Sequence, residues 1–144
     1  MGTAATTYPS FYAHVLAGHV PVPTASWRVA LVSSGYVFDA TDRVWADVSA
    51  HEITGTGYTA GGRELGAPTV ATDATGATWT AAPTTWPGAT FTARWAVLYA
   101  VGTFGGDTNP LALAVLLDET PGDISVADTT FSIIWWPHVA RLEG

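Results

Sequence analysis

Residues 89–101 read ATFTARWAVLYAV, and the alternation of apolar side chains in this stretch decides the fold class. Successive side chains of a β-strand point to opposite faces of the sheet, so every second residue shares a face. The stretch therefore predicts one long strand. Its first face carries Phe91, Trp95, Val97, Tyr99 and Val101, and its second face carries Thr92, Arg94, Ala96, Leu98 and Ala100.

More strands are predicted on both sides of this one, because β-branched and aromatic residues recur between Gly- and Pro-containing turns. Their ranges are 27–32, 65–72, 75–81, 111–117 and 129–136. Roughly six or seven strands with little helix indicate a mainly β fold, a single-domain β-sandwich or barrel with one or two short helices. Residues 1–25 are expected to form an N-terminal extension with a short helix, and residues 26–144 the β domain.

The remaining segments are assigned from their turn-forming and helix-capping residues. Short helices are predicted within 8–19 and 42–50. Residues 73–76 predict a hairpin turn, whereas 83–87, 102–110 and 118–128 are expected to be loops. The strand at 111–117 is apolar on both faces. Its second face must therefore be covered by helices, by another subunit, or by both.

Charge and composition exclude several classes of function. The 144-residue chain has a net charge of −7 and no cysteine, and all five of its basic residues are arginines. Phosphate contacts supply most of the affinity for nucleic acid, so we expect neither nucleic-acid binding nor attraction to anionic membranes. No segment resembles a membrane span or a secretory signal. A chain of this length buries about 70% of its unfolded surface and needs no disulfide or metal for stability.

Residues that could support catalysis or bind metal do not form a known motif. The four imidazoles belong to His14, His19, His51 and His138, and none follows a nucleophile motif. His14 and His19 are five residues apart, which is the wrong spacing for one helical face. We therefore predict no enzyme, no catalytic residues, no cofactor and no metal ligands, although a structural calcium ion held by loop carboxylates stays open. The glycines of 55–62 predict turns or a close backbone approach instead of phosphate binding.

The seven tryptophans have two possible explanations. Exposed rings would form a sugar-binding platform, whereas buried rings would form the core and a subunit interface, where aromatic residues contribute much of the buried area. Trp135 and Trp136 are consecutive and face opposite sides of a strand, so one-sided core packing cannot cover both. Core and interface is the preferred interpretation.

Several motifs together resemble those of a family of small virion proteins from tailed bacteriophages and prophages. They are WRVALV at 27–32, AHEITGTGYTAGG at 50–62, ATWT at 77–80 and ATFTARWAVLY at 89–99. The resemblance covers residues 26–136, and the glycine-rich segment is its most specific part. Arg28 replaces the lysine that is usual in the family, residues 73–76 are shorter than in many relatives, and 83–88 are rich in proline.

The resemblance implies a structural role in a phage particle. The leading hypothesis is a capsid decoration or minor capsid protein on the capsid surface, made in the bacterial cytoplasm, which binds and stabilises the major capsid lattice. It would self-associate as a homotrimer. The expected interface residues are Trp86, Tyr99, Trp135 and Trp136. The alternative is a receptor- or glycan-binding module at the tail or neck.

Overall fold

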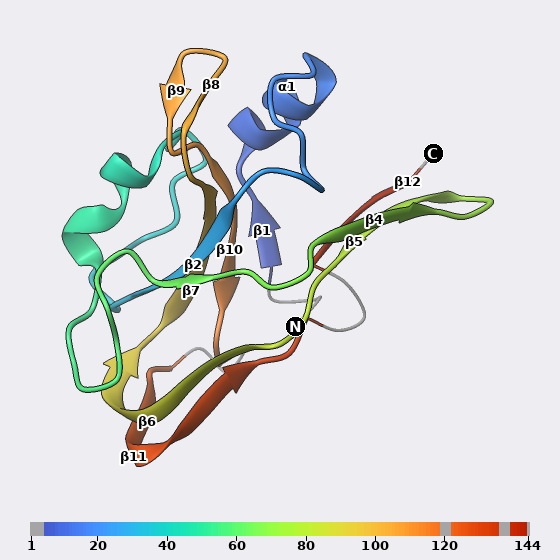
Figure 1. Ribbon diagram of the computed structural model, residues 1–144. Coiled ribbons are helices and arrows are strands. Elements are labelled where there is room, and N and C mark those ends of the chain that lie inside the picture. Colours follow the sequence, from blue (N-terminus) through green and yellow to red (C-terminus); the bar gives the residue numbers. More distant parts are fainter. Residues whose placement is uncertain (1–4, 119–121, 136–138, 144) are drawn as a thin grey trace.

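A five-stranded antiparallel sheet forms the centre of the computed structural model, which describes residues 5–118, 122–135 and 139–143 (Figure 1). The mainly β prediction is confirmed, with one short α-helix in a single domain. The strand order is β1-β10-β7-β2-β3, so the N-terminal segment contributes an edge strand. The bounds are Ala5–Thr7 for β1, Leu111–Leu116 for β10, Trp95–Ala100 for β7, Trp27–Val32 for β2 and Arg63–Glu64 for β3.

Both faces of this sheet are buried, because hydrophobic side chains cover each of them. In β7, Ala96, Leu98 and Ala100 belong to a larger core cluster. Val97 and Tyr99 alternate with them and belong to a smaller cluster. Buried side chains on both faces explain why the β7 and β10 sequences lack a polar face.

The second face is covered by the chain itself, through residues 33–51. This segment contains two 3₁₀ turns, η2 (Trp45–Asp47) and η3 (Ser49–His51), where a helix over 42–50 was expected. Val48 is fully buried beneath them, and the Trp45 ring stacks on Tyr99 with centroids 4.9 Å apart and planes 8° apart. Another subunit is therefore not needed to cover this face.

Hydrogen bonds fix the covering segment in place. The Tyr8 hydroxyl lies 2.6 Å from the Tyr36 hydroxyl, which in turn donates to Asp42 Oδ2 at 2.9 Å. Burial, and then the hydrogen bond to Asp42 among other causes, raises the pKa of Tyr36 to about 12, so both phenols stay protonated. Burial likewise raises the pKa of Asp42. This chain of hydrogen bonds joins 33–42 to the N-terminal segment.

The long strand predicted over 89–101 is divided at Arg94. Residues Thr84–Ala93 form β6, which pairs with β11 (Ile124–Ile133), and β7 begins at Trp95. At the corner, the Arg94 amide donates to Val32 O and the Arg94 carbonyl accepts from Leu117 N. One residue outside the ladder reverses which face the following side chains occupy. Phe91 consequently lies in the larger cluster and Val97 in the smaller one, so their predicted common face is wrong.

The β6–β11 ribbon also corrects two loop predictions. Strand β6 includes 84–87, and β11 begins at Ile124 within the expected 118–128 loop. Pro87 lacks an amide hydrogen, and it lies opposite the register irregularity between Thr129 and Phe131. Among the described strands β6 pairs with β11, and its other side makes an isolated bridge between Thr56 and Thr90, so Pro87 is tolerated where the ladder is irregular.

A second sheet projects from the body as an arm, with strand order β12-β5-β4 (Figure 1). The arm comprises β4 (Thr69–Thr72), β5 (Gly76–Thr80) and β12 (Ala140–Glu143). The predicted turn at its tip is confirmed, because Asp73 Oδ1 accepts from the amides of Thr75 and Gly76 at 2.8 and 3.0 Å. All four residues of β4 are exposed. The remaining elements are α1 (Pro9–Leu16) and the short hairpin of β8 (Thr103–Phe104) and β9 (Asp107–Thr108).

The glycine-rich segment lies against the central sheet. Gly62 has a φ of +86°, and an added Cβ would lie 2.1 Å from the carbonyl oxygen of Val29. Glu52 Oε2 accepts from the Tyr58 hydroxyl at 2.6 Å and from the Gly61 amide at 2.7 Å. These contacts confirm the close backbone approach that the glycines predicted.

Candidate partner-binding groove

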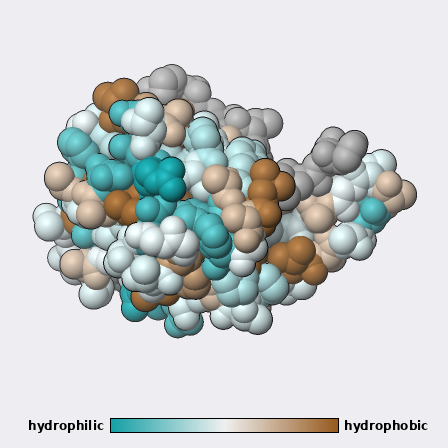
Figure 2. All heavy atoms as spheres, turned by 90° about the horizontal axis from the view of Figure 1, so that it is seen from above, coloured by the Kyte–Doolittle hydropathy of each residue, from teal (hydrophilic) through white to brown (hydrophobic). Residues whose placement is uncertain are grey.

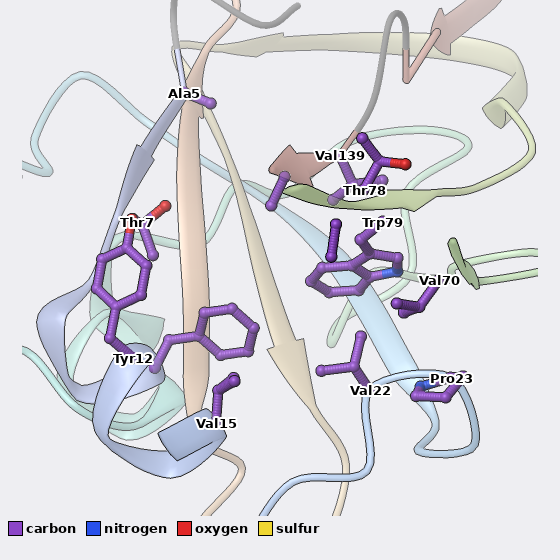
Figure 3. A pocket seen from close by; sticks show the side chains of 13 residues that line it. Ala5, Thr7, Tyr12, Val15, Val22, Pro23, Val70, Thr78, Trp79 and Val139 are labelled. Atoms are coloured by element: carbon purple, nitrogen blue, oxygen red, sulfur yellow. The ribbon is translucent and has the colours of Figure 1, made fainter. Parts of the chain in front are cut away.

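An apolar groove of about 370 Å³ lies where the arm meets the body (Figure 3). Strand β1, helix α1 and the loop at 22–23 form one wall, and the arm strands form the other. Figure 2 shows the arm as a lobe, with apolar residues gathered where it joins the body. The lining side chains belong to Ala5, Thr7, Phe11, Tyr12, Val15, Val22, Pro23, Val70, Ala77, Thr78, Trp79, Val139 and Ala140.

Trp79 supplies the one indole of the groove. Its side chain is only 4% exposed, and its Nε1 is buried without a hydrogen-bond partner. The neighbouring Trp27, which packs against it with ring centroids 4.7 Å apart, donates from Nε1 to Val22 O at 2.9 Å. A buried donor without a partner costs about 1–3 kcal/mol. The Nε1 atom itself has almost no accessible surface, so an acceptor could reach it only if the ring or its neighbours moved.

Among the described residues, two other polar side-chain atoms are buried without a hydrogen-bond partner. They are Trp86 Nε1 and Ser10 Oγ, and neither side chain lines the groove. Of these three residues, only Trp79 lines the groove.

The rim of the groove adds exposed apolar surface. Tyr12 on α1 is 41% exposed and Val70 on β4 is 43% exposed. Among the described residues that line the groove, none has a charged side chain. A surface of this composition favours an apolar occupant, because a charged group would lose its hydration there without gaining a partner.

The residues expected at the interface occupy other positions. Trp86 is 0% exposed, Tyr99 4% and Trp135 5%, so all three rings lie in the core of the single chain. Trp86 stacks on Phe131 at 5.7 Å, and Trp135 Nε1 donates to Thr84 Oγ1 at 3.0 Å. These side chains offer no exposed surface to a partner. Trp136 lies outside the described residues.

The groove residues were missed because sequence alternation does not say which face of a strand is covered. Trp79 was assigned to a strand, but nothing in 75–81 indicated that α1 would lie opposite it. Exposed tryptophan rings for stacking on sugars are likewise not found in the part of the chain that the structure describes. Trp27, like Trp79, is buried in the core, and Trp45 and Trp95 are only partly exposed.

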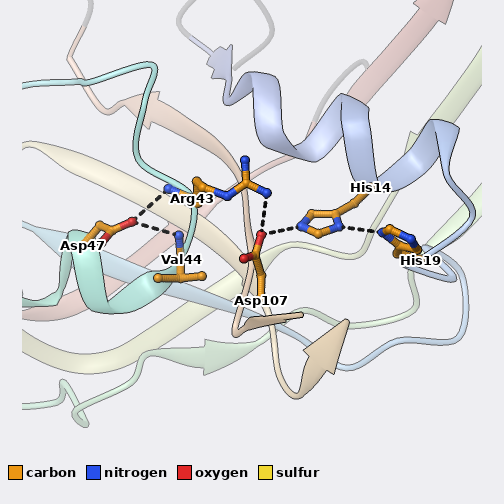
Figure 4. Close-up of polar contacts among 6 residues, drawn as sticks. All are labelled: His14, His19, Arg43, Val44, Asp47 and Asp107. Carbon is orange, nitrogen blue, oxygen red and sulfur yellow. Dashed lines mark hydrogen bonds and ion pairs between the residues drawn. The ribbon is translucent and has the colours of Figure 1, made fainter. Parts of the chain in front are cut away.

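The titratable side chains form local structural contacts. Among the described residues, no three His, Asp or Glu side chains are placed to hold one metal ion. Nor does any described helix have the length and hydropathy needed to span a membrane. The clearest polar cluster joins His14, His19, Arg43 and Asp107 near the end of α1 (Figure 4).

Comparison with known proteins found no match: no family model, no curated protein and no solved structure is similar to this chain. The resemblance to phage virion proteins therefore rests on the sequence motifs alone and stays a prediction.

Proposed function

We propose that this chain is a structural protein of a tailed-phage particle that decorates the capsid, and that the apolar groove binds the major capsid protein. The motifs of residues 26–136 support the viral role. The observation that carries the binding role is the groove, which combines exposed apolar side chains with the unpartnered Nε1 of Trp79.

The occupant of the groove is an extended apolar segment of the major capsid protein. The described lining is uncharged and therefore matches an uncharged segment. Burial of apolar surface supplies about 25 cal/mol per Å² before the costs of association.

The exposed edge of the arm supports self-association, which we propose gives a homotrimer. In the described sheet, β4 pairs on one edge only, with β5, and its residues are all exposed. A regular exposed edge offers unpaired backbone amides and carbonyls to another strand. The β4 strand carries no charged or proline residue that would block such pairing. Size-exclusion chromatography with light scattering tests this step, with a trimer mass expected and a monomer at all concentrations refuting it.

The copy number on purified particles tests the proposed function. Quantitative mass spectrometry should give a fixed ratio of this chain to the major capsid protein, with many copies per particle. Imaging should place these copies across the capsid surface. A few copies confined to one vertex, or a location in the tail, would refute decoration.

A further inference from the structure

The end of helix α1 brings two histidines together that are five residues apart in the sequence. The amide of His19 donates to His14 O at 2.9 Å, and the amide of Gly18 donates to Val15 O at 3.1 Å. Gly18 has a φ of +73°. This pattern is a Schellman motif, in which the chain reverses after the helix and places the second residue beyond it against the last turn. Helical spacing thus does not apply to this pair.

The two rings face one another through the same atom type. His14 Nδ1 lies 3.2 Å from His19 Nδ1, and the ring planes meet at 59° (Figure 4). A divalent zinc ion with bonds of about 2.0–2.1 Å at a tetrahedral angle holds two ligand nitrogens about 3.3 Å apart. The observed separation therefore matches one edge of a zinc coordination tetrahedron.

The other ring nitrogen of His14 is held by a carboxylate. His14 Nε2 donates to Asp107 Oδ2 at 2.8 Å, and the same oxygen accepts from the Arg43 guanidinium at 2.9 Å. A ligating histidine commonly donates its second N–H to a carboxylate, which fixes the tautomer and leaves the first nitrogen free to bind the metal. With the proton on Nε2, a neutral His14 presents the Nδ1 lone pair to His19.

The surroundings give one fixed ligand and one accessible ligand. His14 is 3% exposed, whereas His19 is exposed. Gly105 makes room for the His19 ring, since a Cβ at that position would lie 2.1 Å from His19 Nδ1. An ion between the rings would lie beside the backbone of Gly105, on the side of the exposed His19 ring.

We propose that His14 and His19 bind a divalent transition-metal ion through their Nδ1 atoms, with water completing the coordination. The ion takes the place of the Nδ1 proton that His19 shares with His14, and that proton moves to Nε2 of His19. Imidazole pairs favour zinc, copper and nickel over magnesium and calcium, whose preferred ligands are oxygens. The proposal rests on the two histidines and the contacts of Asp107 and Gly105 with them, and it is independent of capsid binding.

Isothermal titration of the untagged full chain with zinc chloride tests the site. We expect one zinc ion per chain, with no comparable binding of magnesium. H19A should weaken zinc binding at least about tenfold, because it removes one of two protein ligands. D107N should weaken it by about 10- to 100-fold, the effect usual for a carboxylate that orients a ligand. H51Q is the matched control, since His51 lies in η3 outside this cluster, and it should bind zinc like the unaltered chain.

Nitrogen-15 spectra of the imidazole rings identify the ligand atoms. Zinc should shift the Nδ1 resonances of His14 and His19 and leave those of His51 in place. An ordinary hydrogen bond between the two rings predicts no such shift and no saturable zinc binding, and that result would overturn the proposal. Zinc binding that H19A leaves unchanged would also overturn it.

Discussion

Replacing Gly62 by alanine tests whether the glycine-rich segment is a structural contact. Its φ of +86° lies in the left-handed region, and its backbone lies directly against β2. The atoms that a new Cβ would meet are the Val29 carbonyl oxygen at 2.1 Å and Ala30 Cα at 2.8 Å. Because these are backbone atoms, the clash cannot be relieved by turning a side chain. Either β2 or the 59–62 turn must move.

The magnitude follows from two costs. A non-glycine residue in the left-handed region costs about 1–2 kcal/mol. Forcing extra volume into a packed site typically adds about 1–3 kcal/mol. G62A should therefore lower the free energy of unfolding by about 2–5 kcal/mol. G88A is the matched control, since Gly88 has a φ of +59° and an added Cβ would meet nothing within 4 Å. The free energy of unfolding of G88A should fall by the first cost alone, about 1–2 kcal/mol.

Urea unfolding followed by tryptophan fluorescence measures both variants. The midpoint of G62A should lie clearly below that of G88A, and the melting temperatures should differ by roughly 3 °C for each kcal/mol. Equal destabilisation of the two variants would refute the close approach. An unaltered stability of G62A would show that the segment is free to move, as a ligand-binding loop would be.

Three further substitutions test the hydrogen bonds described above. Y58F removes the phenol that bonds Glu52 and should cost about 1–3 kcal/mol, whereas Y12F on the exposed Tyr12 should change stability little in the same urea assay. Desolvation raises the pKa of Asp107, but hydrogen bonds from a histidine and an arginine outweigh it and lower the pKa overall. The advantage of the unaltered chain over D107N should therefore shrink as pH falls through that lowered pKa. Desolvation raises the pKa of Asp42, so the stability of the unaltered chain relative to D42N should increase as pH falls. Stability is measured from unfolding curves between about pH 3 and 6. If the unaltered chain and both variants depend on pH in the same way, both assignments are contradicted.

Sequence patterns predicted the elements whose neighbours lie close in the chain. The hairpin turn at 73–76 and the short helix within 8–19 depend on local turn and capping chemistry, and both are present. The mainly β class follows from alternation in the same way. What alternation could not locate is the corner at Arg94, because the residues on both sides favour strand equally and only the change of pairing partner divides them.

The candidate sites were not predicted, because the groove depends on contacts between distant segments and the histidine pair depends on where the helix ends. Trp79 is a strand residue in any local pattern, and its position in a groove depends on where α1 packs. His14 and His19 fail the test of helical spacing because the helix ends between them. The tryptophan content indicated that these rings lie in the core or at an interface. Trp86, which was expected at an interface, is buried in the core of the single chain.

A charge placed in the groove gives the most direct test of the account. Val70 lines the groove and is 43% exposed, whereas Val101, 42% exposed, lies outside it, so V70D and V101D change similar surface. Binding of each chain to particles assembled without it should show V101D close to the unaltered protein. V70D should lose roughly 30-fold or more, because an unpaired buried charge costs about 2–5 kcal/mol. Since Val70 also lies on the proposed pairing edge of β4, light scattering must show that V70D keeps the oligomeric state of the unaltered chain. Unchanged binding by V70D would contradict the groove as the contact with the capsid.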